Sequence, residues 1–297
     1  MAYHLLRIFL RLVSMIPFSV LYALSGGLYF LLYHVIGYRK KVVHKNLTEC
    51  FPEKSPEEIK EIEKRFYKFL ADNILETCKM GHMSAEEMSK RMKFINVEKV
   101  NERLRQQQSI ALYLGHYANW EWISSMPLHL EKSAVGAQIY HQLSNKDFDR
   151  VMFENREHFG AINVEMRKTA RFINELASDH KVSIIGFIAD QSPRKKDSHY
   201  FVPFLNHNTP ALTGTEKLTK HYKLEPWFVQ TRRVKRGYYE AEFILMHDDR
   251  ASLPDFELTN IYYRMLEQMI CQQPELYLWS HKRFRYATPL SQSPAND

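Results

Sequence analysis

His116 and Glu121 are the residues of this sequence whose types and spacing best suit proton transfer. They follow a compact apolar run at residues 109–114, and Gly115 separates that run from the histidine. A carboxylate bound to one ring nitrogen fixes the tautomer of an imidazole, so the other nitrogen can accept a proton from a hydroxyl group. We therefore interpret His116 as a general base that Glu121 orients through a hydrogen bond. The alternative is an ordinary loop histidine beside a helix.

A second polar cluster follows the apolar run at residues 182–189. It contains Asp190, Gln191 and Arg194, and two lysines come directly after it. Binding sites of open α/β sheets form at the carboxyl ends of the strands, and a cluster in such a place usually has a bound anion or an ion-pair network. A solvated loop is the alternative interpretation.

Several other chemistries are excluded by the sequence. None of the ten glycines belongs to a GxGxxG, GxxxxGK or GxSxG motif, which excludes the usual dinucleotide, P-loop and serine-hydrolase sites. No histidine is followed directly by a glutamate, so the HExxH motif of zinc enzymes is absent. The three cysteines form no CxxC pair and provide no thiolate zinc site. We expect an enzyme that needs no metal and no cofactor.

The elements that would position these residues alternate along the chain. Residues 55–92 have the capping residues and apolar spacing of helices, and residues 147–159 and 168–178 are also predicted to be helical. Strands are expected at 94–98, 109–114, 182–189, 227–230 and 239–246. This alternation predicts an α/β fold with a mixed, largely parallel sheet flanked by helices.

The N-terminal region predicts contact with a membrane. Residues 12–38 contain no Asp, Glu, Lys or Arg, and the run is long enough to cross a bilayer. Gly26 and Gly27 weaken its middle, so a bent or interfacial helix is also possible. A cleaved signal peptide and a helix packed into the protein core are two further alternatives.

Charge gives the expected orientation and the expected kind of partner. More basic residues follow the apolar run than precede it, which favours a cytoplasmic position for the rest of the chain. The formal net charge of +7 suits an anionic membrane surface. We predict an anchor at residues 1–40, a single α/β domain at 41–290 that is mainly helical up to residue 107, and a loose tail at 291–297.

The ordered set of motifs resembles the lipid A biosynthesis (late) acyltransferase family. His116 and Glu121 match the HX4D/E motif of membrane lipid acyltransferases. Further similar segments are NREHFG at 155–160, FVPF at 201–204 and LYLWSHKRFRY at 276–286. The apolar N-terminal segment followed by YRKKVVHKNL at 38–47 is also similar to that family. The resemblance covers nearly the whole chain.

The resemblance implies an enzyme at the cytoplasmic face of the cell inner membrane. It would transfer a fatty acyl chain from a thioester, usually that of acyl carrier protein, to a hydroxyl group of a membrane lipid such as a lipid A precursor. Arg156 would bind a phosphate or the oxyanion, and Asp190, Gln191 and Arg194 would line the acceptor or donor site. Lysophospholipids and aminoacyl lipids are alternative acceptors. A lipid-binding protein without catalytic activity is the competing class, and no nucleic-acid partner is expected.

Overall fold

The two apolar runs that precede the polar clusters form neighbouring parallel strands, β2 (Ile110–Leu114) and β5 (Ser183–Ile188), of the computed structural model. The structure describes residues 2–248 and 253–290. All five residues of β2 are buried, as are the first five of β5. Strands covered on both faces need no alternation of polar and apolar residues, which is why each is a continuous apolar run.

These strands belong to a sheet that has seven strands in the described part of the chain, in the order β1-β9-β8-β2-β5-β3-β4. Strands β8, β2, β5, β3 and β4 are parallel, whereas β9 runs antiparallel to β8 and pairs in parallel with β1. The other bounds are β1 Met92–Ile95, β3 Val135–Tyr140, β4 Ile162–Glu165, β8 Glu225–Lys235 and β9 Tyr238–Leu245. The predicted mixed, largely parallel sheet is confirmed.

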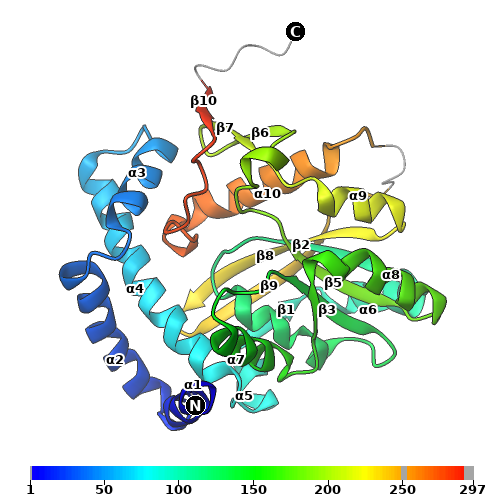
Figure 1. The fold of residues 1–297 in the computed structure, drawn as a ribbon, viewed down its shortest axis with the longest axis horizontal. Coiled ribbons are helices and arrows are strands. Elements are labelled where there is room, and N and C mark those ends of the chain that lie inside the picture. The colour runs from blue at the N-terminus through cyan, green and yellow to red at the C-terminus, as the bar shows by residue number, and fades with distance from the viewer. Residues whose placement is uncertain (1, 249–252, 291–297) are drawn as a thin grey trace.

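Helices flank this sheet (Figure 1). Their bounds are α3 Lys40–Cys50, α4 Pro56–Met80, α5 Ala85–Arg91, α6 Val97–Arg105, α7 Lys146–Glu157, α8 Thr169–Ser178, α9 Gly214–His221 and α10 Glu257–Gln272. Helix α4 begins as its sequence predicts, because Ser55 and Glu58 form a reciprocal capping box. The remaining strands, β6 (Phe201–Phe204), β7 (His207–Pro210) and β10 (Thr288–Pro289), form a separate small sheet.

The N-terminal segment forms two helices that lie along α4 at one edge of the molecule (Figure 1). Helix α1 spans Ala2–Met15, and α2 spans Phe18–Phe30 before it continues as a π-helix at Leu31–Val35. The helix runs unbroken through Gly26 and Gly27. Phe18–Val35 is long and apolar enough, by length and composition, to cross a membrane. The predicted N-terminal apolar helix is thereby confirmed.

Helix α2 is attached to α4 through polar contacts. Ser25, which is almost fully buried, donates a hydrogen bond to Asp72, and the Tyr22 hydroxyl donates to Glu76 at 2.8 Å. The opposite face of α2 is exposed and apolar, including Leu24 at 52% exposure. The segment therefore has both a face packed on the protein and a bare hydrophobic face. The proposed domain limits remain predictions, and the predicted tail at 291–297 lies outside the described residues.

Candidate active site

His116 is held by Asp190, which lies at the equivalent position of the neighbouring strand. Leu114 of β2 pairs with Ile188 of β5, and each of the two polar residues follows its strand by two positions. Asp190 Oδ1 lies 2.6 Å from His116 Nδ1, and Asp190 Oδ2 accepts a hydrogen bond of 3.1 Å from the His116 backbone N–H. One carboxylate thus fixes both the ring and the main chain of the histidine.

Electrostatics favour an ionised Asp190 beside His116. Burial alone would raise the pKa of the Asp190 carboxyl, but the charge and hydrogen bonds of His116 hold that pKa below its usual range. An ionised carboxylate only accepts hydrogen bonds, so Nδ1 of His116 carries the proton. Nε2 is therefore the basic nitrogen, and it lies 3.2 Å from the side-chain amide of Gln191.

Glu121 does not orient His116, contrary to the prediction from the HX4E spacing. Instead, both of its carboxylate oxygens accept hydrogen bonds from Arg156, each at 2.7 Å. Glu121 lies in the first turn of the 3₁₀ helix Trp120–His129, five residues after His116, and its carboxylate forms an ion pair with Arg156 of α7. Burial would raise the pKa of Glu121, but the charge and hydrogen bonds of Arg156 hold it below its usual value.

Arg156 retains hydrogen-bonding capacity beyond this ion pair. Its guanidinium has five N–H donors. One N–H of Nε and one of Nη2 donate to Glu121. Among the residues that the structure describes, the other donors of this guanidinium have no hydrogen-bond partner. Arg156 is thus positioned by Glu121 and can still bind an oxygen atom of a ligand.

A large cavity joins these residues. Its volume is about 970 Å³, near the upper end of the range typical of small-molecule sites, roughly 300–1,000 Å³. Polar residues line one part of it: His116, Glu121, Arg156, Gln191 and Arg194. Much of the remaining wall is apolar: Leu112, Leu114, Ile123, Met126, Ile139, Phe187, Ile188, Leu212 and Leu218. The cavity can accommodate a long apolar chain next to a basic nitrogen.

Two residues of the predicted substrate-binding set differ from expectation in position. Asp190 is only 1% exposed and lies behind His116 rather than on the cavity wall. Arg194 does line the cavity, but its side chain is 64% exposed and forms an ion pair with Asp197 at 3.4 Å. Arg194 thus lies at the solvent side of the cavity, whereas Gln191 contacts the histidine directly.

The basic and aromatic C-terminal segment packs behind the site. Leu278 N–H donates to the His116 carbonyl, and Ala118 N–H donates to the Leu276 carbonyl. His281 accepts a hydrogen bond from the Ser192 backbone at 3.4 Å. This segment therefore supports the loops on both sides of the His116–Asp190 pair.

Arg283 is a structural residue that sequence reasoning did not identify. It is 1% exposed and donates hydrogen bonds to Thr209, to the Pro210 carbonyl and to the Tyr263 hydroxyl. A buried arginine with so many partners joins β7 to α10. The alternation of basic and aromatic residues was the available signal, but it indicates a surface equally well.

Comparisons with known proteins identify the family of the chain. The family model for the bacterial lipid A biosynthesis acyltransferase matches residues 1–286. The chain is 23% identical over 279 residues to the lipid A biosynthesis lauroyltransferase of Escherichia coli K12. That match covers 93% of this chain and 89% of the Escherichia coli protein. It is also 22% identical over 277 residues to the lipid A biosynthesis acyltransferase of Haemophilus influenzae. That match covers 91% of this chain and 83% of the Haemophilus protein. The chain therefore belongs to the bacterial lipid A biosynthesis acyltransferase family and is an acyltransferase.

Proposed function

We propose that the protein transfers a fatty acyl chain from the thioester of acyl carrier protein to a hydroxyl group of a lipid A precursor. The observation that carries the proposal is the position of His116, which is fixed by Asp190 at the wall of a largely apolar cavity of about 970 Å³. A thioester is already an activated donor, so the reaction requires a base and a stabiliser of the oxyanion but no protein nucleophile.

The proposed proton and electron movements use the contacts of His116 and Arg156. Nε2 of His116 accepts the proton of the acceptor hydroxyl as its oxygen attacks the carbonyl carbon of the thioester. A carbon–oxygen bond forms, and the electron pair of the carbonyl moves onto its oxygen, where the N–H groups of Arg156 that do not bind Glu121 stabilise it. The carbon–sulfur bond then breaks, and the imidazolium returns the proton to the leaving thiolate. Asp190 stabilises the imidazolium during these steps.

Glu121 has a positioning role in this proposal. Its bidentate ion pair holds Arg156 at the cavity, 2.7 Å from each carboxylate oxygen. A planar guanidinium bound in this way has one allowed orientation, whereas a lysine would not be constrained. Gln191 and Arg194, which line the same cavity, are proposed to bind the substrates.

The proposed location is the cytoplasmic face of the cell inner membrane. Support comes from the exposed apolar face of α1 and α2 and from the basic residues that follow the anchor. The donor, acyl carrier protein, is a soluble cytosolic molecule, so a cytoplasmic catalytic domain meets both substrates.

The test uses the purified full-length protein in neutral detergent with acyl carrier protein thioesters. Release of free thiol is measured with a lipid A precursor, with a lysophospholipid, or without an acceptor, and the lipid product is identified by mass spectrometry. We expect thiol release together with an acylated lipid A precursor. Acylation of the lysophospholipid alone would contradict the proposed acceptor, and no thiol release with any acceptor would contradict acyl transfer from this donor.

A further inference from the structure

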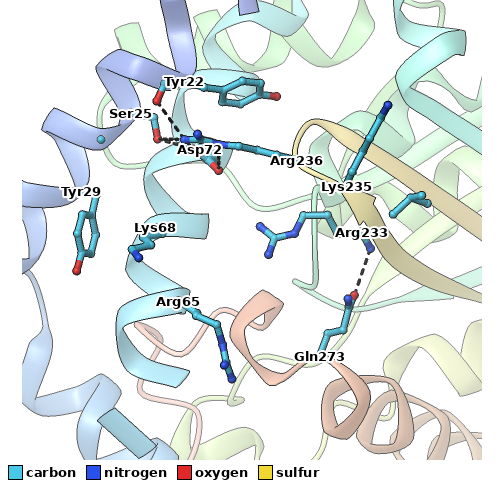
Figure 2. A pocket seen from close by; sticks show the side chains of 12 residues that line it. Tyr22, Ser25, Tyr29, Arg65, Lys68, Asp72, Arg233, Lys235, Arg236 and Gln273 are labelled. Atoms are coloured by element: carbon cyan, nitrogen blue, oxygen red, sulfur yellow. Dashed lines mark hydrogen bonds and ion pairs between the residues drawn. The ribbon is translucent and has the colours of Figure 1, made fainter. Parts of the chain in front are cut away.

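A second cavity lies between α2, α4 and the hairpin formed by β8 and β9, and it shares no lining residue with the cavity at His116 (Figure 2). Its volume is about 660 Å³. Proposed acyl transfer uses none of its side chains. This cavity therefore requires an explanation that is independent of the proposed reaction.

The cavity is strongly basic. Five of its lining residues are cationic: Arg65, Lys68, Arg233, Lys235 and Arg236. Figure 2 shows that they come from two sides, with Arg65 and Lys68 on α4 and the others on the hairpin, and that Arg233 extends from β8 toward α4. Side chains of like charge therefore line one open space, and a bound anion would relieve the repulsion between them.

The protein itself neutralises only part of this charge. Asp72 forms two hydrogen bonds with Arg236, at 2.6 and 2.9 Å. Arg65 and Arg233 share a single carboxylate, Glu275, each at 3.8 Å.

The two lysines are less compensated still. Within residues 2–248 and 253–290, neither Lys68 nor Lys235 has a carboxylate at ion-pair distance; each lies over a tyrosine ring instead. Five cations minus two carboxylates leave three positive charges.

The position of the cavity relative to α2 indicates where an anion would come from. Tyr22, Ser25 and Tyr29 of α2 face the cavity, whereas Leu24 and Phe30, at 52% and 58% exposure, lie on the bare apolar face of the helix. A helix with its side chains is about 10–12 Å wide. An interfacial helix inserts its apolar face about 5–10 Å into the boundary between headgroups and acyl chains. The inner face of α2, and with it the cavity, would then lie at the depth of the lipid phosphates.

We propose that this cavity binds the phosphate group of an anionic lipid headgroup and so fixes the protein on the membrane beside α2. Arginine forms bidentate hydrogen bonds with phosphate, and the flexible lysines add charge. A soluble phosphate offers the same chemistry, and an acidic protein could use the same charges. The lipid is favoured because the cavity adjoins the exposed apolar helix face. The inference does not depend on the identity of the acyl acceptor.

The experiment measures thermal unfolding of the full-length protein in neutral detergent with dihexanoyl-phosphatidylglycerol, dihexanoyl-phosphatidylcholine or inorganic phosphate at equal concentration. It is combined with flotation on vesicles of phosphatidylcholine alone or with phosphatidylglycerol added. The cavity variant carries Lys68→Gln, Arg233→Gln and Lys235→Gln and retains the Asp72–Arg236 pair. The charge-matched control carries Lys93→Gln, Lys99→Gln and Lys132→Gln, all of which are exposed and outside the cavity.

We expect the phosphatidylglycerol to raise the midpoint of unfolding of the wild type and of the control but not of the cavity variant. We also expect at least a tenfold greater loss of affinity for anionic vesicles in the cavity variant than in the control, since about fivefold per charge is typical at a membrane surface. If both variants lost the same affinity for anionic vesicles, the effect would come from net charge alone, and the proposed lipid site would be wrong. Equal stabilisation by inorganic phosphate would overturn the lipid as the source. Loss of binding to acidic acyl carrier protein, with unchanged lipid binding, would make the cavity a protein-docking site and also overturn the proposal.

Discussion

At the scale of single residues, the site consists of two carboxylates with different partners. Asp190 binds His116, and Glu121 binds Arg156. The sequence predicted His116 as the base and Glu121 as its hydrogen-bond partner, but in the structure the carboxylate at Nδ1 of His116 is that of Asp190. Glu121 is near in the chain, whereas Asp190 is 74 positions away and becomes a neighbour only because β2 pairs with β5. Such pairing depends on tertiary packing and cannot be derived from local spacing.

The Glu121–Arg156 pair is predicted to be a coupled structural unit. Removal of either partner leaves a poorly solvated charge, because the two side chains are only 9% and 20% exposed. We expect Glu121→Gln and Arg156→Gln each to destabilise the protein by about 2–5 kcal/mol, and the double variant to lose less than the sum. The measurement is a double-mutant cycle of chemical unfolding. Strictly additive losses would mean that the two side chains act independently. Lys168→Gln, which removes a lysine whose side chain is 72% exposed, is the control and should change little.

His281 is predicted to make the stability of the protein depend on pH. Burial lowers the pKa of His281 to about 4, so the folded protein favours the neutral ring. In the unfolded chain the same ring binds a proton near pH 6.5. The contribution of the neutral His281 ring to the free energy of unfolding is therefore fully present above about pH 6.5, and it is lost as the pH falls toward 4.

The test compares the wild type with His281→Gln, by unfolding at a series of pH values. We expect the variant to show a flatter dependence between about pH 6.5 and 4. An identical pH profile for both proteins would rule out this histidine as the titrating group. The exposed His180 provides a control, and His180→Gln should leave the profile unchanged.

At the scale of elements, the buried strands were the most predictable parts of the fold. Residues 109–114 and 182–189 were predicted as strands, and β2 and β5 occupy Ile110–Leu114 and Ser183–Ile188. Helix α4 was predictable from its capping residues. Strand β3 could not be predicted from its sequence, VGAQIY, because it contains a glycine and a glutamine and is only partly buried. Its position at the sheet follows from pairing with β5 and β4.

Helix α2 was predicted as an apolar segment, but its mode of packing was not. The sequence left open a membrane anchor and a core helix, and the structure shows features of both. Leu21 and Ser25 are buried against the protein, and the opposite face is exposed. The hydrogen bonds from Tyr22 and Ser25 to acidic residues of α4 could not be inferred from hydropathy.

The exposed apolar face of α2 is predicted to control membrane association. Leu24→Glu and Leu31→Glu together place two charges on this face, at positions that are 52% and 43% exposed. We expect the variant to shift to the soluble fraction without a large change in its unfolding midpoint, because neither side chain is part of the core. The measurement is fractionation after alkaline carbonate washing. Full retention in the membrane would contradict this role of the face, and Leu24→Ala with Leu31→Ala is the uncharged control.

At the scale of the whole molecule, the distribution of charge and of exposed apolar surface suits the proposed membrane location. The formal net charge is +7, and helices α1 and α2 lie at one edge of the molecule (Figure 1). Both helices carry exposed apolar residues, and α2 also contributes residues to the basic cavity. Composition predicted an anionic partner. The shape of the two cavities, and the fact that one is basic and the other mostly apolar, required the three-dimensional structure.

The orientation of the molecule is predicted to place the catalytic domain in the cytoplasm. The basic residues that follow the apolar segment favour that side. We expect protease added to intact spheroplasts to leave the domain uncut, and digestion only after lysis. A periplasmic protein in the same sample is the control for accessibility. Cleavage of the domain in intact spheroplasts would contradict the proposed orientation.

The most direct measurement of the central claim is the rate of acyl transfer by His116→Ala and Asp190→Asn, alone and together. General-base assistance contributes about 10²–10⁴-fold to the rate. We predict that His116→Ala lowers kcat by at least this order while the protein stays folded, and that the double variant is little worse than His116→Ala alone, because the pair acts as a unit. Near-normal turnover by His116→Ala, or losses that multiply in the double variant, would contradict the account.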